Sequence, residues 1–280
     1  MEWKDTITTN QGVGGELPPD RRRHANIPLR TPAILKAVPL TIATWNVLAT
    51  AYIRPHFYPD VDPTHLAPAW RIPALARHAR QLQADILCLQ EVERATFEAI
   101  SAILTPLGYT GFLQMKPHGR PDGCATFLRG LPAATQQNVE LDHGHIAQII
   151  TLPQTIVIAN THLKWNPPGE TFGEHQARQI LENLPPSPLQ IICGDCNAEP
   201  GSGPIKVFED AGFTYPHRNA PTCNSNRRAK QIDFILTRGP ASVTPVPPPP
   251  IDNDTPLPSA DHPSDHLPLL AVVDPLPRST

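Results

Sequence analysis

The sequence lacks a strong charge of either sign, a long apolar run and a cysteine framework. Its 280 residues carry a formal net charge of −3 at pH 7, so any nucleic acid must be bound in a local groove rather than by a globally basic surface. No apolar stretch approaches the roughly 20 residues of a membrane span, and the N-terminal MEWKDTITTNQ lacks the apolar core of a signal peptide. Five scattered cysteines, an odd number, favour free thiols in a reducing compartment. We therefore expect a soluble, cytoplasmic protein without membrane contacts.

Internal repeats and interdomain linkers are also missing, so we predict one domain over residues 38–276. Residues 1–37 are polar and show no periodicity, which predicts a flexible N-terminal arm, and residues 277–280 are predicted to be a tail. Of the 36 prolines, 19 lie within residues 18–39, 167–188 and 244–268. We predict that most of them punctuate loops, with an extended segment at 247–250. No feature indicates an obligate dimer, and we expect a monomer.

Apolar runs with strand and helix periodicity alternate along this domain. Strands are predicted at 38–46, 84–90, 122–129, 145–152, 155–160, 189–193, 231–236 and 267–273. Helices are predicted at 72–83, 97–107, 174–184 and 203–212. In the first helix, Leu75, Ala79 and Leu82 form the apolar side, which predicts Arg71 and Arg77 on the opposite, polar side.

Polar residues end, interrupt or precede six of the apolar strands, and this is the feature that indicates a site. Any one of them alone is better explained as a turn former or a satisfied core residue. Six of them in one alternating chain predict that strand ends converge on one cleft. Because Asp195 and Asn197 alternate with Cys196, both side chains point the same way, and their oxygens suit Mg²⁺ or Mn²⁺ rather than zinc. The positions are Asn46, Glu91, His162, Asp195 with Asn197, Asp233, and Asp265 with His266.

Two other patterns are given structural interpretations. Cys193 and Cys196 have CxxC spacing but no second CxxC accompanies them, so we predict two buried small residues. His143 and His145 are predicted to belong to a hairpin turn and to nothing more.

The motifs, in their order along the chain, resemble those of the endonuclease/exonuclease/phosphatase superfamily. The resemblance covers residues 38–275 and is greatest to the branch of the cytoplasmic mRNA deadenylases, nocturnin and the Angel proteins. No leucine-rich repeat precedes the motifs, so a free-standing catalytic unit is expected. The matching segments are TWNVLA at 44–49, LQEV at 89–92, DGCATF at 122–127, NTHLKWNP at 160–167, GDCNA at 194–198, QIDF at 231–234 and SDHL at 264–267.

This resemblance implies a fold and a metal ion. The fold is an α/β (α+β) four-layer αββα sandwich like that of DNase I, with two mixed β-sheets packed together and flanked by helices. The activity is that of a metal-dependent phosphodiester hydrolase. Glu91 would bind the principal Mg²⁺, for which Mn²⁺ can substitute, assisted by Asn46 and by Asp265.

The resemblance also implies the catalytic roles. Asp195 would position or deprotonate the attacking water, and Asn197 would steady that water or bind a second ion. His162 and His266 would contact the scissile phosphate. Asp233 would orient His266 through a hydrogen bond from imidazole to carboxylate.

Substrate contacts follow less directly. In deadenylases a proline after the THL motif and an aromatic residue before the Ile-Asp pair embrace the terminal base, and Pro167 matches the proline. No aromatic residue lies between Thr222 and Ile232, so a strict poly(A) preference is not predicted. Arg228 can instead stack on a base or bind phosphate, and Lys164 is expected beside the groove.

Three functions remain open at this stage. The first is a Mg²⁺-dependent 3′-to-5′ exoribonuclease that acts on single-stranded RNA and releases 5′-mononucleotides. The second is a phosphatase or phosphodiesterase of small nucleotides or RNA termini, such as a 2′-phosphate or a 2′,3′-cyclic phosphate. The third is a nucleic-acid-binding module without catalysis.

Overall fold

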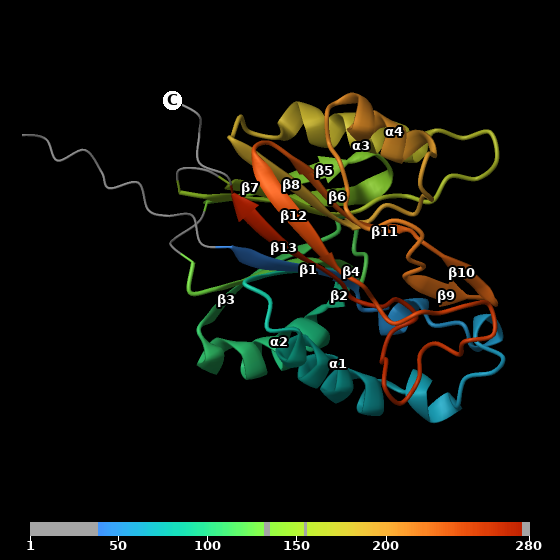
Figure 1. Cartoon of the computed structure of the whole chain (residues 1–280). Helices are drawn as coiled ribbons and strands as arrows, with labels where there is room; N and C mark the ends of the chain where they lie inside the picture. Colours follow the sequence, from blue (N-terminus) through green and yellow to red (C-terminus); the bar gives the residue numbers. More distant parts are fainter. Residues whose placement is uncertain (1–38, 132–134, 154–155, 276–280) are drawn as a thin grey trace, which may run out of the picture. The chain divides into compact units, whose positions relative to one another are not determined.

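The structure is a computed structural model that describes residues 39–131, 135–153 and 156–275. The predicted arm at 1–37 and the tail at 277–280 lie outside the described residues. Two β-sheets pack face to face, and helices cover the outer face of each (Figure 1). The predicted four-layer sandwich is confirmed. None of the described helices is long and apolar enough to cross a bilayer.

The first sheet has six strands in the order β12-β13-β1-β2-β4-β3. Neighbours are antiparallel except for β1 and β2, which are parallel and are joined across the outer face by the helix α1. The helices α1 (Pro68–Leu82) and α2 (Arg94–Leu104) cover that face (Figure 1). The strands are β1 (Leu40–Asn46), β2 (Ile86–Glu93), β3 (Tyr109–Met115), β4 (Asp122–Arg129), β12 (Ala241–Val246) and β13 (Leu269–Pro275).

The second sheet has five strands in the order β11-β8-β7-β6-β5, with β7 and β8 parallel. The helices α3 (Phe172–Asn183) and α4 (Gly203–Asp210) cover its outer face (Figure 1). A small ribbon of β9 (Cys223–Ser225) and β10 (Arg228–Lys230) lies beside the sandwich. The strands of the sheet are β5 (Thr135–Leu141), β6 (His145–Leu152), β7 (Ile156–His162), β8 (Leu189–Asp195) and β11 (Asp233–Arg238).

One core lies between the two sheets, and two others lie between each sheet and its helices. Because both faces of each sheet are covered in this way, the strands are apolar on both faces. Ile42 and Ile86 of the first sheet meet Ile158 and Ile191 of the second, and all four are fully buried. All five cysteines are buried and unpaired, so the interpretation of Cys193 and Cys196 as core residues is confirmed. Since both faces of each sheet are covered, the polar strand ends at one rim are the places where chemistry is accessible.

One sequence prediction about an individual residue is wrong. Arg71 does not lie on the polar side of α1: it is fully buried, while Arg77 is exposed as expected. The Arg71 guanidinium donates to the carbonyls of Val47, Leu48 and Pro263, and these bonds replace the hydration that helical periodicity predicts for it.

Most of the proline-rich stretch at 244–268 is loop, as predicted, and its first three residues complete β12. Pro245 is tolerated in β12 because β12 is an edge strand.

Candidate active site

Three predicted residues form a row across the second sheet. His162 ends β7, Asp195 ends β8 and Asp233 begins β11. The register pairs His162 with Asp195 and Asp195 with Asp233, so their side chains leave adjacent strands at the same level. Strand pairing alone therefore brings together residues that are far apart in the chain.

A glycine allows β7 and β8 to pair this closely. Gly194 has a φ of 150°, and a Cβ at this position would overlap the carbonyl oxygen of Thr161 on β7. No other residue fits without moving a strand. Gly194 thereby sets the position of Asp195, the next residue.

The Asp195 carboxylate lies at the centre of the group. Its Oδ2 accepts from Asn46 Nδ2 at 2.9 Å, and its Oδ1 accepts from the backbone N–H of Asn197 at 2.8 Å. The Nε2 atoms of His162 and His266 lie 3.7 and 3.8 Å from Oδ2. Burial raises the pKa of Asp195 to about 7, with His266 opposing and Asp233 adding to the shift. A carboxylate with this pKa is suited to exchange a proton near neutrality.

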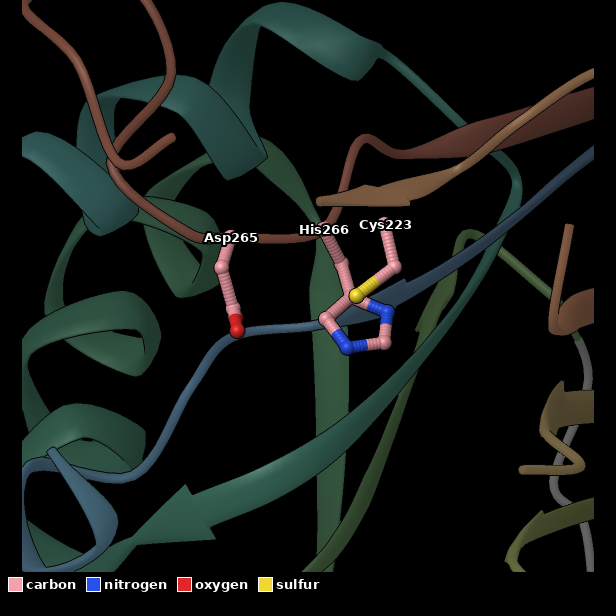
Figure 2. Close-up of side chains that lie close together, drawn as sticks. All are labelled: Cys223, Asp265 and His266. Carbon is pink, nitrogen blue, oxygen red and sulfur yellow. The ribbon is translucent and has the colours of Figure 1, made fainter. Parts of the chain in front are cut away.

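His266 forms a buried pair with Asp233. Its Nδ1 lies 2.8 Å from Asp233 Oδ2, which also accepts from the hydroxyl of Thr222 at 2.6 Å. Burial alone would lower the pKa of His266, but the Asp233 carboxylate and the thiol of Cys223 raise it well above the ordinary value. Figure 2 shows that thiol next to the imidazole ring, with Asp265 on the other side. The imidazolium form is therefore favoured, as the predicted orienting role of Asp233 requires.

Glu91 reaches the site from the first sheet through an irregularity in β2. The register of β2 against β4 shifts between Leu89 and Val92, and Glu91 has a φ of 56°. Its Oε1 accepts from Asn46 Nδ2 at 3.1 Å and its Oε2 from the backbone N–H of Ala49 at 2.8 Å. Burial and the charge of Asp265 raise the pKa of Glu91. Two crowded carboxylates in a buried place are a destabilising arrangement that a cation would relieve.

Asp265 supports the same conclusion. Its Oδ2 accepts from the hydroxyl of Tyr58 at 2.9 Å, whereas its Oδ1 is buried and has no hydrogen-bond partner among the described residues. An acceptor oxygen left alone in this way is expected where an ion belongs. The residues present thus fit a hard divalent cation. Asn46 turns its Nδ2 to both Glu91 and Asp195 while its Oδ1 accepts from Leu48, so a ligand role for that oxygen needs a half-turn of the amide.

His162 is fixed from behind by a buried ion pair. Lys116 Nζ lies 2.7 Å from Asp122 Oδ2 and 3.5 Å from His162 Nδ1. Burial, and then the charge of Lys116, lower the pKa of His162 well below its ordinary value. The neutral form of His162 is therefore favoured. Its Nε2 lies 3.0 Å from Asn197 Nδ2, which also donates to the carbonyl oxygen of Leu163 at 2.9 Å, so this backbone acceptor fixes the orientation of the Asn197 amide.

Sequence reasoning missed several supporting residues. His145 is not merely part of a turn: it begins β6, is buried, and its Nδ1 lies 2.7 Å from the His162 carbonyl oxygen. Burial and the charge of Lys116 lower the pKa of His145 to about 4. The pair of Lys116 with Asp122 and the hydroxyl of Tyr58 were also not predicted. Asp122 opens the DGCATF motif, and that position was the one available signal.

Part of the site borders a cleft of about 780 Å³, whose lining tests the predicted substrate contacts. Glu91, His162 and Asn197 line it, and so do Lys164 and Pro167. The predicted Arg228 lies exposed on β10 and does not line this cleft. Its role stays a prediction that the cleft does not support.

The comparison with known families agrees with this geometry. The Endonuclease/Exonuclease/phosphatase family matches residues 43–266, from β1 to the loop that carries His266. The chain belongs to this family. The predicted superfamily is confirmed, since the match includes the described site from Asn46 to His266.

Curated relatives in the family include the nocturnin of Mus musculus, 28% identical over 304 residues that cover 90% of this chain and 69% of the relative. The mouse 2′,5′-phosphodiesterase 12 is 24% identical over 309 residues, which are 81% of this chain and 50% of that protein. The chain thus spans between half and about two-thirds of the length of these relatives. These relatives support the predicted resemblance to the branch that includes nocturnin.

Solved structures show the same fold. The structure of ANGEL2, described as a 2′,3′-cyclic phosphatase, in complex with adenosine-2′,3′-vanadate has a TM-score of 0.71 at 20% identity and covers 85% of this chain and 96% of that one. The human Nocturnin catalytic domain with bound sulfate has a TM-score of 0.62 at 25% identity, with coverages of 84% and 93%. This chain therefore shares its architecture of two sheets flanked by helices with these two structures.

Proposed function

We propose that this family member is a Mg²⁺-dependent phosphodiester hydrolase that acts as a 3′-to-5′ exoribonuclease on single-stranded RNA and releases 5′-mononucleotides. The observation that carries the proposal is the meeting of Glu91, Asp195 and the Asp233–His266 pair, together with His162, in one group. Glu91 and His162 of this group line the cleft. The kinship to nocturnin and to a protein named as a phosphodiesterase supports the same reaction class.

Glu91 and Asp265 would bind the Mg²⁺, or Mn²⁺ in its place. When bound, the ion supplies positive charge for the phosphate oxygens on which negative charge develops. Asn46 keeps the Glu91 and Asp195 carboxylates in place by donating to both. Tyr58 does the same for Asp265.

Asp195 would position the attacking water and accept its proton. Its carboxylate accepts or directs the proton of the water, and its pKa of about 7 matches that task. The backbone N–H of Asn197 fixes one carboxylate oxygen, so the other faces the two histidines. The Asn197 amide would steady the same water.

His162 and His266 would contact the scissile phosphate, and their different environments give the two imidazoles different charges. His266, paired with Asp233, presents a positive imidazolium. His162, beside Lys116, presents a neutral imidazole. One charged and one neutral imidazole would together stabilise the negative charge of the phosphate.

A second candidate function is the removal of a phosphate from a small nucleotide or an RNA end, or the opening of a 2′,3′-cyclic phosphate to a phosphomonoester. The relatives named as a 2′,3′-cyclic phosphatase and a 2′,5′-phosphodiesterase favour it. The same Asp195 and histidines would serve that reaction, because water attacks phosphorus in both.

The two candidates are separated by products. Oligo(A), mixed-sequence RNA, single-stranded DNA and NADP⁺ are each incubated with the protein and Mg²⁺, and again with a chelator. Shortening of RNA from the 3′ end, abolished by the chelator, is the result we expect. Release of free phosphate without shortening would replace the first candidate by the second. No product from any substrate would overturn both.

We also propose that the protein acts in the cytoplasm as a monomer. The five unpaired thiols support a reducing compartment. Among the described residues, the large exposed apolar side chains are few and lie in separate segments of the chain, which gives no indication of a large apolar interface: Phe57, Leu107, Trp165 and Val246.

A further inference from the structure

Trp165 is the large apolar side chain that the described part of the chain leaves most exposed, at 56%. It lines the same cleft as Glu91 and His162. No hydrogen bond or ring contact of its indole is found within residues 39–131, 135–153 and 156–275. A bare indole beside a group of phosphate-binding residues therefore needs a partner that the folded chain does not provide.

The backbone around Trp165 is fixed, so the exposed indole is not a consequence of a loose loop. The N–H of Lys164 donates to Gln176 Oε1 at 2.7 Å. On the other side, Asn166 accepts from the N–H of Gly173 at 2.8 Å and donates to Glu174 at 2.6 Å. Both neighbours of Trp165 are thus tied to α3 or its N-terminal end. A side chain on so rigid a support binds a flat ligand with little loss of conformational freedom.

The charges nearby favour a ligand that carries phosphate. Lys116 is neutralised by Asp122, and His118 faces Glu140 at 3.4 Å. Arg120 donates to the carbonyl of His143, and no carboxylate partner for it is found among the described residues. Lys164 lies 4.9 Å from the centre of the Phe172 ring and likewise has no carboxylate partner there. Two uncompensated cations thus border the cleft beside the indole.

We propose that Trp165 is the stacking platform for a nucleobase next to the scissile phosphate, with Arg120 and Lys164 attracting the adjoining phosphates. This inference rests on the proposed function for the position of the scissile phosphate. An indole face stacks on any base, and purines offer it the larger ring. A base that stacks on Trp165 is not paired, so the substrate class is an unpaired nucleotide, in single-stranded RNA or in a small nucleotide, and not duplex.

Binding of adenosine 5′-monophosphate and of ribose 5-phosphate to the full chain tests this proposal by isothermal titration. Ribose 5-phosphate is the base-free probe. Trp165→Ala is expected to weaken adenosine monophosphate binding by about 5- to 150-fold, the range for one stacked base, and to leave ribose 5-phosphate unchanged. Trp165→Phe should retain most of the affinity. Leu107→Ala, an exposed apolar side chain outside the cleft, is the matched control.

Fluorescence gives an independent readout. Adenosine monophosphate should quench part of the emission of the native protein, and Trp165→Phe should lose that quenching while its titrated affinity persists. An affinity of Trp165→Ala within about twofold of native, an equal loss for ribose 5-phosphate, or no binding to the native protein would overturn the platform. If stacking is observed but no RNA is hydrolysed, the platform stands and the proposed activity falls. If Trp165→Ala binds adenosine monophosphate normally and hydrolyses RNA as well as the native protein does, the proposed activity stands and the stacking platform falls.

Discussion

The two sheets contribute to the site in different ways. The second sheet presents His162, Asp195 and Asp233 as a row set by regular strand pairing. The first sheet presents Glu91 from a distorted part of β2, with a positive φ and a shifted register. The contribution of the second sheet depends on backbone hydrogen bonds that any well-formed sheet makes. The contribution of the first sheet depends on contacts with residues distant in sequence, namely the side chain of Asn46 at the end of β1 and the backbone N–H of Ala49.

This difference indicates a division of labour. Under the proposed function, the sheet with regular pairing would carry the groups whose mutual geometry must be fixed for proton transfer. The irregular strand would carry an acid for a metal ion, whose coordination tolerates some adjustment of the ligand. Substitutions in the two sheets should therefore differ in what they affect.

The largest effect is expected in the row of the second sheet. Asp195→Asn should fold normally and lose at least about 10³-fold in rate, because it removes the proton acceptor for water. Initial rates of RNA shortening, with circular dichroism as the check on folding, measure it. Asp210→Asn, exposed at the end of α4, is the control. Activity above about a tenth of native would exclude the role given to Asp195.

Glu91→Gln tests the irregular strand of the first sheet. It should lower activity by about 10²-fold or more and remove the rise in melting temperature that Mg²⁺ causes in the native protein, since binding to the folded state alone stabilises it. Differential scanning fluorimetry with and without Mg²⁺ gives the comparison. Glu93→Gln, two residues further along β2, should keep the response. Equal responses in native and Glu91→Gln protein would place the ion elsewhere.

Gly194→Ala tests whether regular pairing sets the row. The added methyl overlaps the Thr161 carbonyl oxygen, so we expect a loss of about 3 kcal/mol or more in the free energy of unfolding. Gly108→Ala has a φ of 85° and open space around the new methyl, and should cost only about 1–2 kcal/mol. Urea unfolding of both variants distinguishes the cases. Similar losses would mean that backbone strain, and not the strand contact, requires glycine at 194.

The smallest effect concerns His145, at the edge of the row. Its folded-state pKa of about 4 lies below the unfolded value near 6.5, so the unfolded chain takes up the proton first as pH falls. Its contribution is therefore complete above about pH 6.5 and is lost progressively toward pH 4. Native protein should lose about 1–2 kcal/mol more between pH 7 and 5 than His145→Gln does. Parallel curves in urea unfolding would contradict this.

The strands and the polar residues at their ends could be predicted because both follow from local patterns, whereas the four-layer sandwich was implied by the resemblance to the superfamily. Alternating apolar runs located most strands, and polar residues at the strand ends marked His162 and Asp195 as candidates. The supporting contacts could not be predicted, because their partners are far apart in sequence. Tyr58 and Asp265 are separated by 207 positions, and no local pattern pairs them. The burial of Arg71 contradicted helical periodicity for the same reason.

Arg71 connects parts of the molecule that are distant in sequence. Its guanidinium donates to the carbonyls of Val47 and Leu48, just after Asn46, and to that of Pro263, just before the segment with Asp265 and His266. One buried side chain of α1 thus fixes two segments of the candidate site from outside the cleft. The packing of α1 against the first sheet is therefore coupled to the positions of Asn46, Asp265 and His266.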